Sequence, residues 1–188
     1  SQAAFLAVLG CVIGGITVTG LNPDSQQGDK VILDILKRCG GKFKPVEGGL
    51  HFDRSLLKAT EIDLADCPDL GPILFTLGCF CSGETVIRNA GRLRLKESDR
   101  IEAMQTELRK MGARIEVDGD TVHIQGVALH APNAPLSGHN APRIVMALAV
   151  AAIASGLPAL LCGAEAVDKS WPAFWSVLRG LGAKVELN

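Results

Sequence analysis

The heptapeptide Leu108-Arg109-Lys110-Met111-Gly112-Ala113-Arg114 has two close counterparts elsewhere in the chain. These are Leu36-Lys37-Arg38-Cys39-Gly40-Gly41-Lys42 and Leu178-Arg179-Gly180-Leu181-Gly182-Ala183-Lys184. The glycines at positions 40, 112 and 182 are 72 and 70 residues apart. Each is placed to end a helix, because glycine enters the left-handed backbone region without the steric cost of a Cβ. A period of this length indicates an internal repeat, so three copies of one structural unit are predicted.

Each copy extends upstream in the same order. Strongly apolar stretches at about 2–13, 70–81 and 143–155 are predicted to be helices, and short strands follow near 16–19, 85–88 and 159–162. A loop then leads to a second, amphipathic helix, predicted at about 28–39, 98–111 and 171–181. A strand pair follows, closed in the middle copy by the turn Asp118-Gly119-Asp120. The predicted unit is therefore helix–strand–helix–strand–strand.

The first helix of each unit is apolar on all sides, so we expect it to be buried. We therefore predict a single α/β (α+β) domain over residues 1–188. It is an inside-out, barrel-like arrangement of three pseudo-symmetric units, about 1–65, 66–137 and 138–188, with buried helices and outer sheets. A doubly wound sheet also alternates strands with helices, but it does not predict a threefold period. The chain begins inside a predicted helix, so we expect it to be part of a longer protein.

The composition is that of a globular protein, with 47% apolar residues, 21% charged residues and a net charge of -1. The absence of a basic surplus argues against a nucleic-acid partner. The apolar stretch 1–15 is too short to span a bilayer, and the stretch 144–161 is broken by Ser155, Gly156 and Pro158. No basic segment precedes the first stretch, as a signal peptide would require. We expect a cytoplasmic protein with no membrane contact.

The cysteines and histidines do not indicate a metal site. None of the six cysteines forms a C-x-x-C pair, and their neighbours are mostly apolar. We predict reduced thiols packed in the core, because small hydrophobic side chains of this kind are usually buried. The four histidines have no ligand spacing and are expected in loops or at the surface.

The predicted helix starts carry the most informative residues. Backbone N–H groups at a helix N-terminus attract anions, and the unit architecture brings several such starts to one face. Basic side chains on that face would add a site for phosphate and carboxylate groups. These side chains are Lys96, Arg100, Arg143 and Lys169.

Ordinary structural roles remain open for the same residues. Asp69, Ser98 and Asp168 could be N-caps, and Glu97 with Arg100 could be a surface ion pair. The alternation of charge and leucine at 92–96 is also typical of a strand with one exposed face. From these residues alone, the chain is an anion-binding α/β protein.

The segment Leu95-Lys96-Glu97-Ser98-Asp99-Arg100 resembles the Lys-Glu-Ser/Thr-Asp-Arg signature of 5-enolpyruvylshikimate-3-phosphate (EPSP) synthases. Four further segments resemble elements of that family in the same order along the whole chain: 25–29, 66–70, 138–147 and 168–172. The family has two domains, each of three helix–strand units, with the active site between them. The resemblance implies that this chain corresponds to the C-terminal domain only.

The resemblance also implies a reaction. The enzyme, which acts in the shikimate pathway of aromatic amino-acid biosynthesis, transfers the enolpyruvyl group of phosphoenolpyruvate to the 5-hydroxyl of shikimate 3-phosphate and needs no cofactor. On this basis Asp69 takes the hydroxyl proton and binds shikimate 3-phosphate, Glu97 handles protonation of the phosphoenolpyruvate methylene, and Lys96 contacts shikimate 3-phosphate. The residues implied to hold phosphoenolpyruvate are Arg100, Arg143 and Lys169.

The chain departs from the family pattern at Ala141 and Pro142, where the family has Asp and His. Both of those residues lie near the reacting groups in the family, so their loss is expected to impair turnover even with the missing N-terminal domain restored. The chain alone is expected to lack transferase activity, because half of the ligand shell is absent. Two alternatives remain open. One is a domain of UDP-N-acetylglucosamine enolpyruvyl transferase, which shares the fold and the donor but differs at the 96–100 signature. The other is a catalytically inert domain that binds anions.

Overall fold

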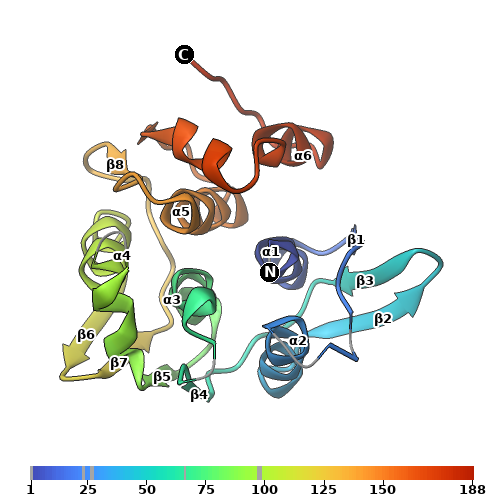
Figure 1. Ribbon diagram of the computed structural model, residues 1–188, viewed down its shortest axis with the longest axis horizontal. Helices are drawn as coiled ribbons and strands as arrows, with labels where there is room; N and C mark the ends of the chain where they lie inside the picture. The colour runs from blue at the N-terminus through green and yellow to red at the C-terminus, as the bar shows by residue number, and fades with distance from the viewer. Residues whose placement is uncertain (1, 23, 26–27, 66, 97–98) are drawn as a thin grey trace.

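The computed structural model describes residues 2–22, 24–25, 28–65, 67–96 and 99–188. Three helices lie side by side in the middle of the molecule (Figure 1). They are α1 (Ala3–Ile13), α3 (Gly71–Phe80) and α5 (Pro142–Ser155). Three further helices lie outside them: α2 (Gly28–Arg38), α4 (Arg100–Arg109) and α6 (Phe174–Gly180). All six correspond to helices predicted from the sequence, although α2, α4 and α6 are shorter than expected.

The strands form three separate sheets at the periphery (Figure 1). The first sheet is antiparallel and contains β1 (Ile16–Val18), β3 (Gly49–Asp53) and β2 (Lys42–Val46), in that order. The second has the order β4 (Glu61–Asp63), β5 (Glu84–Arg88), β7 (Thr121–Gln125) and β6 (Arg114–Asp118). The third is the parallel pair β8 (Leu136–Ser137) and β9 (Leu161–Cys162). The mixed α/β fold with inner helices and outer sheets is confirmed, but over the described ranges the sheets do not join into one closed barrel.

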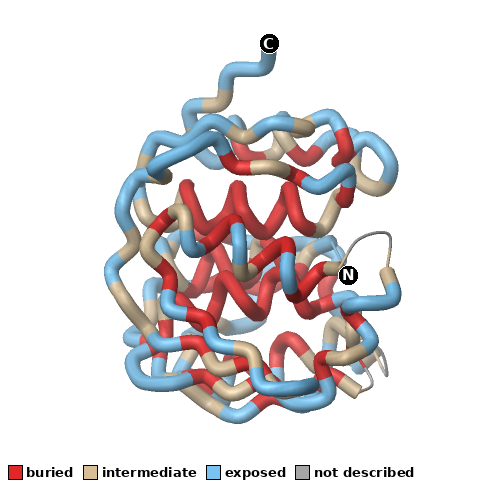
Figure 2. Tube along the Cα trace, turned by 90° about the vertical axis from the view of Figure 1, so that its left-hand side faces the viewer, coloured by how far each residue is buried: buried red, intermediate tan, exposed pale blue. Residues whose placement is uncertain are grey.

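The three central helices form the core (Figure 2). In α3 every residue from Gly71 to Cys79 is buried, and in α5 every residue from Ile144 to Ala152 is buried. The two helices contact each other directly, and the hydroxyl of Thr76 donates a hydrogen bond to the carbonyl oxygen of Ala147 at 2.9 Å. Fully burying each Leu or Ile side chain here contributes about 1.5–3 kcal/mol. The prediction that the apolar helices lie inside is confirmed.

The three repeated glycines end their helices in the same way. Gly40, Gly112 and Gly182 have φ values of +84°, +88° and +98°. In each case the next amide N–H donates to a carbonyl oxygen inside the helix, at 2.7 Å for Gly41 to Leu36, 3.2 Å for Ala113 to Leu108 and 3.1 Å for Ala183 to Leu178. This is the long hydrogen bond of a Schellman motif, which satisfies a carbonyl that the helix itself leaves unpaired. The predicted helix-ending role of the glycines is confirmed.

The third copy of the unit is incomplete in the structure. Residues 183–188, which follow the same glycine signal as β2 and β6, are not in a strand. A strand needs a neighbour to receive its backbone hydrogen bonds, and no described strand pairs with this segment. The predicted strand pair is therefore wrong for this copy.

A strand at 92–96 is also ruled out. Residues Ala90–Leu95 form the 3-10 helix η2, which begins after Asn89 turns the chain through a left-handed conformation, with φ +57°. Leu93 is buried whereas Leu95 is 84% exposed. Two leucines that are two residues apart on a strand would face the same side, so the alternation reflects one inward and one outward side chain of a tight helix.

Five of the six cysteines are buried and Cys162 is exposed, which confirms the core prediction for the five. Burial raises the pKa of the Cys79 thiol to about 12. Within the described part of the chain, no helix is both long and apolar enough to cross a membrane.

The Schellman glycine of the middle unit provides a test of the fold. We expect Gly112→Ala to destabilise the protein by about 1–3 kcal/mol, because φ +88° is strained for alanine and the new Cβ would lie 2.7 Å from the ring of His130. The matched control is Gly180→Ala, whose Cβ would meet no atom within 4 Å in α6. That change is expected to leave stability unchanged or to raise it by up to about 1 kcal/mol. Urea denaturation of both variants would decide, and equal stabilities would contradict the helix-ending role of Gly112.

Candidate active site

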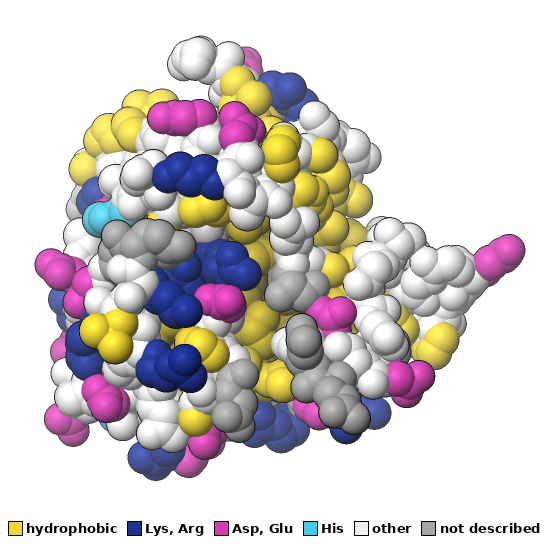
Figure 3. Space-filling model, viewed as in Figure 1, with side chains coloured by type: hydrophobic (Ala, Val, Ile, Leu, Met, Phe, Trp, Pro, Cys, Tyr) yellow, Lys and Arg dark blue, Asp and Glu magenta, His cyan; other side chains and the backbone are white. Residues whose placement is uncertain are grey.

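Several helix starts meet on one face of the molecule. They belong to η1 (Pro68–Leu70), α4 and α5, and the end of η2 and the 3-10 helix η3 (Ala164–Lys169) lie beside them. On this face, Lys and Arg side chains surround an acidic side chain (Figure 3).

The acidic residue at the centre of the basic group is Asp69. Its Oδ1 lies 3.2 Å from Nη1 of Arg100 and 3.5 Å from Nζ of Lys96, and its Oδ2 lies 3.7 Å from Nη2 of Arg143. Nε of Arg143 also donates to the backbone oxygen of Asp69 at 3.2 Å. Four residues predicted from distant parts of the sequence are thus in direct contact. We call Asp69, Lys96, Arg100 and Arg143 the Asp69 cluster.

The local sequence explains how the cluster is positioned. Pro68 opens η1, and Pro142 opens α5, as predicted, because proline already has the backbone angle of a first helical residue. Asp99 caps α4 by accepting a hydrogen bond from the amide of Glu102 at 3.0 Å. This cap fixes Arg100 at the start of the helix, where its side chain is only 4% exposed.

The alternative capping roles are not found. Asp69 lies inside η1 and uses its carboxylate for the basic residues, and Asp168 lies in the last turn of η3. Glu97 and Ser98 lie outside the described residues, so the predicted catalytic role of Glu97 and the predicted capping role of Ser98 are not placed.

The electrostatics of the cluster favour the ionised carboxylate of Asp69. Partial burial on its own would raise its pKa, but Arg143, Lys96 and Arg100 outweigh this effect and hold the pKa below the ordinary range. Asp69 is therefore a carboxylate at neutral pH and acts as the internal counterion of three cations. An incoming anion would have to share these cations with it.

A cavity of about 250 Å³ lies next to the cluster. It is lined by Arg100, His139, Asn140, Pro142, Arg143, Lys169 and Ser170. Nζ of Lys169 donates to the backbone oxygen of Asn140 at 2.9 Å and also to its side-chain oxygen. Lys169 thus lines the same cavity as Arg100 and Arg143. It does not form an ion pair with Asp69, which is likewise a described residue.

The sequence placed His139, Asn140 and Ser170 in segments that resemble the family, but it assigned no role to any of them. His139 and Asn140 have φ values of +50° and +53°, a left-handed turn that non-glycine residues rarely adopt. Such strain often occurs at functional sites, but it is visible only in the backbone angles. The available sequence signal was the position of both residues just before a predicted helix start.

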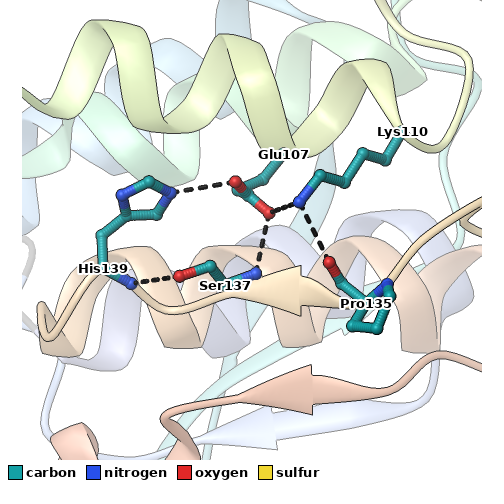
Figure 4. A network of polar contacts seen from close by, with 5 residues as sticks. All are labelled: Glu107, Lys110, Pro135, Ser137 and His139. Atoms are coloured by element: carbon teal, nitrogen blue, oxygen red, sulfur yellow. Dashed lines mark hydrogen bonds and ion pairs between the residues drawn. The ribbon is translucent and has the colours of Figure 1, made fainter.

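Behind this turn lies a buried carboxylate that the sequence also missed (Figure 4). Glu107 of α4 has a side chain only 2% exposed and contacts Lys110, His139 and the amide of Ser137. Burial alone would raise its pKa, but the hydrogen bonds from these three groups and the charge of Lys110 hold it below the ordinary range. In the sequence, Glu107 is one of several charged residues in a predicted amphipathic helix, and nothing distinguishes it from the others.

Comparison with known proteins identifies the family. The family model of EPSP synthase (3-phosphoshikimate 1-carboxyvinyltransferase) matches residues 1–178. The 3-phosphoshikimate 1-carboxyvinyltransferase of Clostridium kluyveri is 39% identical over 188 residues, which cover 99% of this chain and 43% of that protein. The enzyme of the same name from Clostridium acetobutylicum is 43% identical over 185 residues, covering 98% of this chain and 42% of that protein.

Solved structures agree with this match. The EPSP synthase of Acinetobacter baumannii superimposes with a TM-score of 0.79 at 26% identity, over 95% of this chain and 44% of that one. The enolpyruvyl transferase NikO of Streptomyces tendae, at 20% identity and a TM-score of 0.72, shares the fold. The chain therefore spans less than half the length of the curated relatives that it matches.

The internal counterion leads to a prediction about anion binding. We expect Asp69→Asn to increase the affinity of the isolated chain for inorganic phosphate several-fold, because the three cations lose the carboxylate that competes for them. Asp120→Asn is the control, since it removes the same charge from a surface pair with Arg94. Calorimetric or NMR titration measures the affinities. An Asp69→Asn variant that binds phosphate no more tightly than the control would disprove the counterion role.

Proposed function

Since the chain belongs to the EPSP synthase (3-phosphoshikimate 1-carboxyvinyltransferase) family, we propose that it forms one half of the active site of such an enzyme. The reaction transfers the enolpyruvyl group of phosphoenolpyruvate to the 5-hydroxyl of shikimate 3-phosphate and releases inorganic phosphate. The other half of the ligand shell comes from a complementary domain, in keeping with the 43% of a relative that this chain covers. The family match does not favour the alternative UDP-N-acetylglucosamine transferase.

The observation that carries the proposal is the convergence of Lys96, Arg100 and Arg143 on one carboxylate, beside a cavity that also holds Lys169. The two substrates bring two phosphate and two carboxylate groups. Fixed cations in a partly enclosed site stabilise such ligands and the charge that develops during their reaction. Arginine suits this task, since its planar group can bind two oxygens of one anion.

Asp69 is proposed to act as the proton acceptor for the attacking hydroxyl. In the ligand-free chain its pKa is held low by the surrounding cations, which makes it a weak base. Substrate anions that bind those cations would weaken their effect on Asp69, whereas the effect of partial burial, which raises the pKa, would remain. Ligand binding would thus make Asp69 a stronger base when the hydroxyl is in place.

The remaining roles follow the charge of each side chain. Arg100, Arg143 and Lys169 line the cavity and are proposed to hold the phosphate and carboxylate of phosphoenolpyruvate. Lys96 contacts Oδ1 of Asp69 but does not line the cavity, and it is proposed to bind shikimate 3-phosphate. Glu97 is proposed to donate the proton to the methylene carbon. In the addition step the methylene carbon of phosphoenolpyruvate gains a proton from Glu97, and the 5-hydroxyl of shikimate 3-phosphate loses its proton to Asp69. In the elimination step phosphate leaves, and the new methyl group returns a proton to Glu97.

Ala141 and Pro142 limit what the chain can do. Ala141 precedes α5 without a side-chain cap, and Pro142 begins the helix on the wall of the cavity, so neither offers an acid or a base. Because the other half of the ligand shell is missing as well, we propose that the chain by itself binds anions without turnover. The cytoplasmic location expected from the sequence is retained as part of the proposal.

Phosphate release tests this function. The chain would be incubated with phosphoenolpyruvate and shikimate 3-phosphate, first alone and then with the complementary segment of the Clostridium acetobutylicum relative. We expect no phosphate release by the chain alone and measurable release in the mixture with the complementary segment. In the mixture, Ala141→Asp together with Pro142→His should increase the release, and Arg100→Ala should abolish it. Arg94→Ala, which removes a surface ion pair, is the control.

Two results would count against the proposal. Phosphate release by the unassisted chain would contradict the claim that half the site is inert. If Arg100→Ala left phosphoenolpyruvate binding unchanged in the mixture, the assignment of the cavity to that substrate would be wrong.

A further inference from the structure

A chain of contacts links the buried Glu107 to the wall of the cavity (Figure 4). Oε1 of Glu107 accepts hydrogen bonds from Nζ of Lys110 at 2.6 Å and from the amide of Ser137 at 2.7 Å. Oε2 lies 2.9 Å from Nε2 of His139. Both oxygens of the carboxylate are therefore engaged, and the carboxylate joins α4 to the segment that leads into α5.

His139 is held at two points. Its ring contacts Glu107, and its amide donates to the hydroxyl of Ser137 at 3.2 Å within the left-handed turn. In the neutral ring, a hydrogen bond from Nε2–H to Glu107 leaves the lone pair on Nδ1. Figure 4 shows Nδ1 on the side of the ring away from Glu107, and it forms no hydrogen bond with another described residue. Because His139 lines the cavity, Nδ1 is the ring nitrogen available to a ligand.

We propose that His139 is a further anion-binding residue of the cavity, which takes a proton from solvent onto Nδ1 when an anion binds, and that Glu107 is the positioning residue that fixes its ring. The proposal rests on the proposed function, since it concerns the same cavity. In the bound state the imidazolium donates Nδ1–H to the anion and Nε2–H to Glu107.

The charges around the ring explain why proton uptake depends on the anion. Arg100, Arg143 and Lys169 share the cavity with His139 and oppose a further positive charge there. Glu107 favours the imidazolium, but its carboxylate is shared with Lys110. A bound dianion offsets the three cations, so the balance moves towards the protonated ring. This coupling is reciprocal, and the protonated ring must therefore bind the anion more tightly.

Two carboxylates of the described site residues, Asp69 and Glu107, do not titrate in the same pH range as histidine in the ligand-free chain. The pKa values of Asp69 and Glu107 both lie below their ordinary values of 3.8 and 4.5. Ordinary histidines titrate between about pH 5 and pH 8. In the ligand-free chain neither carboxylate titrates in that range. Because an anion that binds the cations also raises the pKa of Asp69, the His139→Gln variant is needed to assign a pH-dependent change in affinity to the imidazole.

Sulfate is the appropriate probe, because it stays a dianion over this whole range, whereas phosphate and phosphoenolpyruvate gain a proton. Titration calorimetry of the chain with sulfate at constant ionic strength would be run at about pH 5.5 and about pH 8. We expect the affinity to fall about three- to tenfold over this interval. Near neutral pH, two buffers of different ionisation heat should reveal uptake of a substantial fraction of one proton.

Variants assign the proton to His139. His139→Gln should remove both the proton uptake and the pH dependence, and Glu107→Gln should reduce both while keeping the neutral hydrogen bonds to Ser137 and Lys110. His123→Gln is the matched control, because His123 also pairs with a carboxylate, Glu84, but on the strands β7 and β5 rather than at the cavity. Circular dichroism and melting temperature would verify that each variant is folded.

The outcomes separate this inference from the function on which it rests. If sulfate binding depends on Arg100 but keeps its proton uptake in His139→Gln, the inference is wrong and the proposed anion site stands. Unchanged proton uptake in Glu107→Gln would disprove the positioning role. If the folded wild-type chain binds no sulfate at all, or binds it independently of Arg100, both the inference and the anion site are overturned.

Discussion

Three helices that are apolar on every side must be buried away from water, and the rest of the structure depends on this requirement. α1, α3 and α5 can all be buried only if they pack against one another, so the strands and the polar helices are left to cover the outside (Figure 2). The packing also sets the positions of the helix ends. The starts of α4 and α5 and the short helix before α3 lie close together, so the packed helices bring Arg100 and Arg143 to the cluster.

The sequence predicted the fold well where the information was local and repeated. The glycine at the end of each amphipathic helix is a strong signal, since one residue type fits the left-handed backbone there, and all three proved correct. Continuous apolar stretches likewise gave the buried helices. The failures arose where a pattern needed a partner that the sequence does not specify. The third strand pair lacks a neighbouring strand, and the leucines at 93 and 95 alternate for a reason other than strand pairing.

The candidate site shows the same division. Asp69, Lys96, Arg100, Arg143 and Lys169 were recognised because they lie in motifs that resemble one family, and the structure brings the first four into contact. Glu107 was not singled out, and His139 lay in a recognised segment without an assigned role, because their importance depends on burial and on a pairing across 32 residues. A glutamate on an amphipathic helix is normally solvated, and only the packing of α4 against α5 makes this one a buried anchor.

The position of Asp69 has a consequence for how the site comes into being. Three like charges gathered on one face repel one another, and a site that depended on its substrate for neutralisation would be assembled only when the substrate arrived. Here the polypeptide carries its own neutralising group, in contact with all three cations before any ligand is bound. The same carboxylate is the group proposed to accept a proton once substrate anions take over the cations. Asp69 thus serves first in folding and then in the reaction. The ligand binds to cations that the folded chain has already positioned.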